Sequence, residues 1–144
     1  MSEELNKSKK SAAELQAALE GVNTAAAEAR MTFNDIAAAL GKAASKNKDF
    51  SEGFKTAQKD VRDLSAEAAK LSKFDKATLE TSKGRASVAK QLSSLASKRT
   101  KAQATLNANL KKMRNATDAE VVSLNKQNIL LIDAINSAED LTGS

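Results

Sequence analysis

The sequence predicts an all-α protein, built from long amphipathic helices that form an elongated coiled coil or a helical bundle. The 144 residues include no Pro and only five Gly, so few positions force the chain to turn. Hydrophobic residues make up 41% of the chain, but many are Ala, which favours helix and buries little area. Apolar residues recur at intervals of three and four, which is the spacing of one helix face.

Polar stretches divide the predicted helices into four segments. We place the breaks near 45–49, 72–84 and 115–117, and the segments at 1–48, 49–84, 85–116 and 117–144. In the first segment, an N-terminal helix, Phe33, Ile36 and Leu40 continue one apolar face. Gly21 or Gly41 permits a bend there without requiring one.

The second segment carries the clearest heptad pattern. From Phe50 to Leu71 the apolar residues follow steps of four and three, with charged residues at most other positions. Asp49 and Glu52 have the spacing of a capping box at its start. So narrow a stripe favours an intermolecular coiled coil, and an amphipathic helix within a folded monomer is the alternative.

The heptad pattern falters after Leu71, and a hinge, helix end or short loop is expected before Gly84. The basic helix that follows places Arg99 at a core-type position. A buried, unpaired Arg is costly, so this side chain must either reach water or meet a carboxylate. Thr117 and Glu120 then form an S/T-x-x-E capping box at the start of the last helix.

The last helix, an apolar and acidic segment, is apolar on more sides than any other part of the chain. Ile129, Leu130 and Ile132 extend its apolar residues around the circumference, and such side chains need a large surface to bury them. The helix is either the central helix of a bundle or an oligomer contact. For the whole chain, the predicted oligomer seam consists of Phe50, Phe54, Val61, Leu64, Leu71, Val88, Leu92, Leu95, Leu131 and Ile135.

Charge is segregated along the chain, whose net charge is +5. No acidic residue lies between Glu80 and Asp118, whereas from Thr117 onward Lys126 is the single positive charge. The basic stretch packs against the acidic tail of the same or a neighbouring chain, faces an acidic protein surface, or is solvated without a partner. Its candidate partner-facing residues are Lys83, Arg85, Lys90, Lys98, Arg99, Lys101, Lys111, Lys112 and Arg114.

The missing residue types argue against an enzyme. Without His and Cys there is no imidazole base, thiolate, disulfide, or zinc or haem site with the usual ligands, so we predict no catalytic, cofactor-binding or metal residues. The charged run after Met1 and the lack of a long apolar window predict neither a signal peptide nor a membrane span. The basic stretch lacks aromatic residues and DNA-binding motifs, which argues against sequence-specific reading of nucleic acid.

Three stretches, MTFNDIAAALGKAASKNKDF, FKTAQKDVRDLSAEAAKL and AKQLSSLASKRTKAQATLNANLKKM, resemble the N-terminal helical region of tape measure proteins of long-tailed bacteriophages. The resemblance implies a virion protein, a homo-oligomeric rod of a few parallel chains, with a trimer favoured. Such a rod occupies the acidic lumen of the tail tube and sets tail length during assembly. It also implies that this chain is a fragment or a short relative of a longer protein.

Two other functions remain open from the sequence. In the first, the chain is a self-contained helical bundle that acts as an adaptor or interaction module and folds back at the three breaks. In the second, it binds nucleic acid nonspecifically through residues 83–114, with contacts that weaken as salt rises. In either case a cytoplasmic location is expected.

Overall fold

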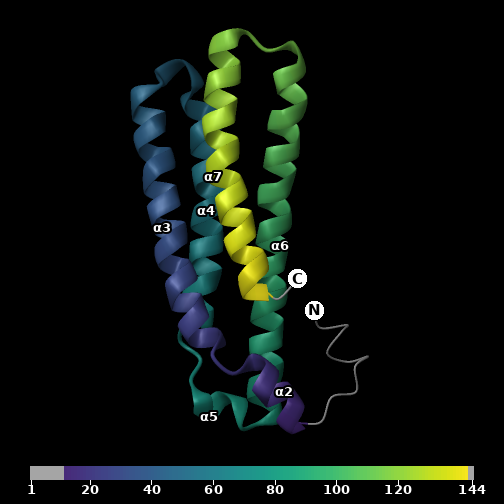
Figure 1. The fold of residues 1–144 in the computed structure, drawn as a ribbon. Coiled ribbons are helices and arrows are strands. Elements are labelled where there is room, and N and C mark those ends of the chain that lie inside the picture. The colour runs from purple at the N-terminus through teal and green to yellow at the C-terminus, as the bar shows by residue number, and fades with distance from the viewer. Residues whose placement is uncertain (1–11, 143–144) are drawn as a thin grey trace.

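The computed structural model describes residues 12–142. Its long helices lie side by side and alternate in direction (Figure 1). These helices are α3 (Val22–Lys46), α4 (Ser51–Leu71), α6 (Ser82–Lys112) and α7 (Asp118–Thr142). The short helices α2 (Ala12–Leu19) and α5 (Lys76–Leu79) lie at one end, and the 3₁₀ turns η1 (Lys48–Phe50) and η2 (Met113–Asn115) lie at the other. The all-α prediction is confirmed, and of its two forms the structure is an up-and-down helical bundle.

The chain reverses where the sequence predicts breaks. Residue 47 and η1 separate α3 from α4, residues 72–81 separate α4 from α6, and η2 with residues 116–117 separates α6 from α7. One further break divides the predicted N-terminal helix at Gly21, whose φ of 83° is a left-handed conformation that glycine adopts without steric cost. Residues 1–11 and 143–144 of the first and last predicted segments lie outside the described range.

The heptad stripe of α4 lies at the centre of this bundle. Phe54, Val61, Leu64 and Leu71 are completely buried, and α4 packs against α3, α6 and α7 of the same chain. Each such side chain contributes about 1.5–3 kcal/mol when it leaves water. The stripe is therefore closed by the chain's own helices.

This arrangement changes the interpretation of the predicted oligomer seam. Nine of its ten residues are buried inside the single bundle, and the tenth, Phe50, is half-buried and packs against that core. The physical reason is that heptad spacing reports which face of a helix is covered and not which chain covers it. Short connections here return the chain onto itself, so a second copy is not needed to cover these side chains. The buried members are Phe54, Val61, Leu64, Leu71, Val88, Leu92, Leu95, Leu131 and Ile135.

The two predicted capping boxes have different outcomes. Thr117 and Glu120 cap α7 reciprocally: the Glu120 amide donates to Thr117 Oγ1, and the Thr117 amide donates to Glu120 Oε1, both at 3.3 Å. The box at Asp49 and Glu52 is wrong, because the residue before α4 is Phe50 and no side chain caps that helix. Asp49 already lies inside η1, which leads directly into α4, so the chain is helical before the expected cap.

Gly84, predicted near a hinge, lies instead in the first turn of α6. Asp75 caps α5 by accepting from the Thr78 amide at 2.9 Å, and Thr81 caps α6 by accepting from the Gly84 amide at 2.9 Å. A Cβ at position 84 would lie 1.8 Å from the carbonyl oxygen of Thr78. Gly84 is therefore needed for the close approach of α5 to α6.

Candidate interaction surface

The nine basic residues predicted to face a partner do not form one surface. Arg85 is buried, and its guanidinium Nη1 donates to the Leu79 carbonyl at 2.7 Å. It holds the end of α5 against α6, so its assignment as a partner-facing residue is corrected. Lys98 and Arg99 are half-buried, and the remaining six are exposed: Lys83, Lys90, Lys101, Lys111, Lys112 and Arg114.

Arg99 finds the carboxylate that its core-type position requires. Its Nη1 lies 3.6 Å from Glu139 Oε1, so the pair connects α6 with α7. This confirms that the seam at this position supplies a carboxylate partner. It also shows one contact between the basic helix and the acidic tail of the same chain. Because both side chains are partly exposed, the pair contributes at most about 1 kcal/mol.

Four of the exposed lysines are aligned along α6, and we call them the lysine row: Lys83, Lys90, Lys101 and Lys112. They are separated by steps of seven, eleven and eleven residues, which are close to whole numbers of helical turns. The row therefore follows a nearly straight line about 44 Å long at 1.5 Å per residue. The sequence of α6 contains no Asp or Glu, so no acidic residue of this helix interrupts the row.

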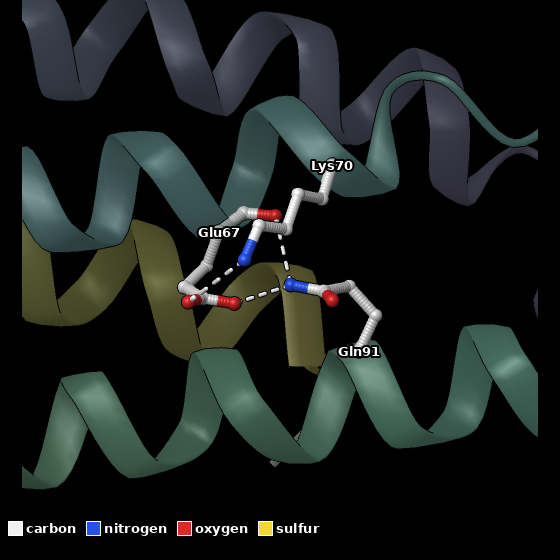
Figure 2. A network of polar contacts seen from close by, with 3 residues as sticks. All are labelled: Glu67, Lys70 and Gln91. Carbon is white, nitrogen blue, oxygen red and sulfur yellow. Dashed lines mark hydrogen bonds and ion pairs between the residues drawn. The ribbon is translucent and has the colours of Figure 1, made fainter.

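Glu67 of α4, which faces α6, makes its contacts with Gln91 and Lys70 and not with the lysine row. Glu67 is buried, and its carboxylate accepts a short hydrogen bond from Gln91 Nε2 on α6 and pairs with Lys70 Nζ at 3.8 Å (Figure 2). The same Gln91 amide also donates to the Glu67 carbonyl at 3.4 Å. Within residues 12–142, no carboxylate lies at ion-pair distance from a lysine of the row.

Asp60 makes a second polar contact between α4 and α6. It is buried, and its Oδ2 accepts a 2.5 Å hydrogen bond from Thr105 Oγ1. Burial raises the pKa of this carboxyl above its ordinary value, although the Thr105 hydrogen bond and the charge of Lys101 act in the opposite direction. Its burial and its bond to Thr105 leave Asp60 poorly placed to meet an external ligand.

At the end of the bundle near η1 and η2, an open groove of about 480 Å³ lies between α4, α6 and α7. Its lining carries both signs of charge around a partly apolar floor: Asp49, Phe50, Glu52, Gly53, Lys111, Lys112, Asn115, Glu120, Leu124 and Gln127. The charges of the two lysines are offset by three carboxylates, so this groove has no strong preference for an anion or a cation.

Sequence reasoning missed a buried amide cluster beneath this groove. Asn109 Nδ2 on α6 donates to Gln127 Oε1 at 3.1 Å and to Asn128 Oδ1 at 3.0 Å on α7. All three residues are buried, and in the described part of the chain no buried side-chain nitrogen or oxygen lacks a partner. The available signal was polar residues at core spacing in QNILLI. This cluster fixes the alignment of α6 and α7.

The described residues contain no cluster of acidic side chains suited to hold a metal ion. None of the helices in this range is long and apolar enough to cross a membrane. Comparisons with family models, with curated proteins and with solved structures give no match for this chain. The lysine row is accordingly the strongest candidate for a functional surface among the basic residues.

Proposed function

We propose that this protein is a non-enzymatic interaction module, a self-contained helical bundle that presents the lysine row to an acidic protein surface. The main observation in support of this proposal is that α6 has two different faces. Its inner face, including Val88, Leu95 and Ala102, is completely buried in the core, so folding uses that side. Its outer face has exposed lysines at regular spacing without intervening acids, which folding does not require.

The chemistry of the row favours a protein partner over nucleic acid. Four ammonium groups on a straight line about 44 Å long match an acidic helix or sheet edge of similar length. Stacking of bases requires aromatic side chains, and α6 contains none. Nonspecific DNA binding by phosphate contacts is the alternative that the experiment must separate.

The tape-measure resemblance leads to a different proposal, in which the chain contributes to a rod in a phage tail. A continuous helix of 144 residues would be about 216 Å long, whereas α6, the longest helix, is about 46 Å. A ruler function would therefore require the bundle to open at its reversals. The folded bundle supports the interaction module better, and the phage-tail function stays a prediction.

The test uses the full chain, with poly-L-glutamate as a model acidic partner and a duplex DNA as the competing class. The variant Lys90→Glu/Lys101→Glu reverses two central charges of the row. The matched control, Lys42→Glu/Lys55→Glu, makes the same change in charge at exposed positions on α3 and α4. At about 50 mM salt we expect poly-L-glutamate to bind, and the row variant to bind about tenfold more weakly.

The control variant is expected to change affinity less than threefold, because its charges lie away from the row and are screened. Circular dichroism must show equal helicity in all three proteins. The proposal fails if both double variants lose affinity equally, or if poly-L-glutamate does not bind at low salt. Tighter binding of DNA, with a steep salt dependence and loss in the row variant, would replace it with nonspecific nucleic-acid binding.

A further inference from the structure

The exposed large apolar side chains of the described residues concentrate on α7 and its neighbour α6. Three of the five large ones lie on α7: Val122 is 56% exposed, Ile129 61% and Ile132 43%. A fourth, Leu110, is 51% exposed on α6. The fifth, Met31, lies on α3. A single exposed apolar residue is ordinary on a protein surface, but a group of four on adjacent helices is not.

Three of these four residues follow one side of α7 over about three turns, the fourth lies on the neighbouring helix α6, and we call the four the α7 patch. Asn109 bonds to Gln127 and Asn128, which places its neighbour Leu110 at the level of the middle of α7. Ile129 and Ile132 are one helical turn apart, and Val122 lies two turns before Ile129, so the three share one side of the helix. Figure 1 shows α7 alongside α6, with its outer side uncovered.

Folding does not need the α7 patch. The opposite face of α7 is already in the core, where Leu131, Ala134 and Ala138 are completely buried. The chain thus retains isoleucine and valine where polar residues would serve equally well in an isolated bundle. An additional surface that covers them explains the apolar circumference of this helix.

The charges beside the patch indicate what that surface is. Lys126 and Asp133 are both exposed and seven residues apart, so they lie on the same edge of α7, three residues before and four residues after Ile129. In an antiparallel pair of α7 helices related by a two-fold axis near Ile129, residues on one edge face the same edge of the partner. Lys126 of each copy then faces Asp133 of the other.

We propose that a second copy of this chain docks on the α7 patch, with the two α7 helices antiparallel and Ile129 near the two-fold axis. The alternative parallel pairing brings that edge opposite the other edge of α7, where Asn125 and Asn136 carry no charge. Two ion pairs form in the first arrangement and none in the second. The charge pattern therefore selects a closed, antiparallel dimer.

The ends of α7 set the extent of this contact. Asp118 and Asp140 lie eleven residues on either side of Ile129, so an antiparallel pair brings them to the same level, about 16 Å from the axis. Their like charges oppose close packing there. Helices that cross at the common angle of about 50° separate at their ends, which confines the contact to the middle of α7.

The experiment measures the mass of the full chain by sedimentation over a range of concentrations from about 1 to 500 µM, in low salt, because exposed ion pairs weaken as salt rises. The wild-type chain is expected to shift from the 15.2 kDa monomer toward a dimer. Lys126→Glu and Asp133→Lys each place like charges across the axis, and each alone is expected to weaken self-association at least tenfold.

An equimolar mixture of these two variants distinguishes the antiparallel arrangement from others. In the mixed dimer, the introduced glutamate of one chain faces the introduced lysine of the other, and the unchanged Asp133 faces the unchanged Lys126. Both ion pairs are thereby restored, and association should recover to the wild-type level or above. A matched pair of apolar changes completes the set: Ile129→Ser should reduce association, and Met31→Ser, at an exposed position outside the patch, should not.

A chain that remains monomeric at every concentration overturns the proposal. So does a dimer that is insensitive to Lys126→Glu and Ile129→Ser, or a mixture of the two charge variants that fails to associate. None of these changes alters the lysine row. A failure of the dimer proposal therefore does not count against binding of an acidic partner, and a failure of that binding does not count against the dimer.

Discussion

At the scale of single residues, Asp60 makes the folded protein sensitive to pH. Its pKa is raised chiefly by burial, so the folded chain retains this proton at a pH where the unfolded chain has lost it. Stability from this group is therefore greatest below the ordinary Asp value of about 3.9 and falls as pH rises through that value toward the raised one. Above the raised pKa, the destabilisation caused by the buried, ionised Asp60 no longer changes with pH.

Asp60→Asn tests this directly. An amide cannot ionise, and its oxygen can still accept the Thr105 hydrogen bond. We expect the variant to be at least as stable as the wild type at pH 7 and to lose less stability between pH 3 and 7, as measured by urea unfolding. If the difference in unfolding free energy between the two proteins is the same at every pH in this range, the assignment of a raised pKa is wrong.

At the scale of helices, the junction of α5 with α6 depends on one missing side chain. Gly84→Ala places a methyl group against the backbone oxygen of Thr78, which cannot rotate away, so α5 must move from α6. We expect a loss of about 1–3 kcal/mol, measured by urea unfolding, with the helical content retained.

Gly41→Ala is the matched control for that substitution. Its added methyl would meet the end of the Gln58 side chain, which can move, and alanine also favours helix over glycine by about 1 kcal/mol. Its stability should therefore stay within about 1 kcal/mol of the wild type. Equal losses in the two variants would show that the backbone contact at Gly84 is not the cause.

Helix positions and buried faces were largely predictable from the sequence, because apolar spacing and polar breaks are local signals. Periodicity identified the buried side of α4, and the Thr117 box marked the start of α7 within a residue. What covers the α4 stripe depends on contacts between distant segments, so spacing alone could not show that the chain closes on itself. The buried role of Arg85 and the Asn109 amide cluster were missed for the same reason: polar residues signal exposure until a specific partner is known.

At the scale of the whole molecule, the bundle and the rod differ severalfold in radius of gyration. A compact chain of this length has a radius of gyration of about 15 Å, and a moderately elongated bundle is slightly larger. A continuous helix about 216 Å long has a value near 60 Å. Small-angle X-ray scattering at low micromolar concentration should give a value below about 20 Å, and a value above 40 Å would favour the rod.

Two glutamines lie where two glycines leave room for them. Gln58 of α4 lies against Gly41 of α3 and donates to the Ala37 carbonyl at 2.9 Å, while Gln127 of α7 lies against Gly53 of α4. A shift of α4 along α3 would take Gln58 away from Gly41 and break its hydrogen bond to the Ala37 carbonyl. Axial sliding between these two helices therefore costs a polar contact, and a core that relies heavily on alanines still has a preferred alignment.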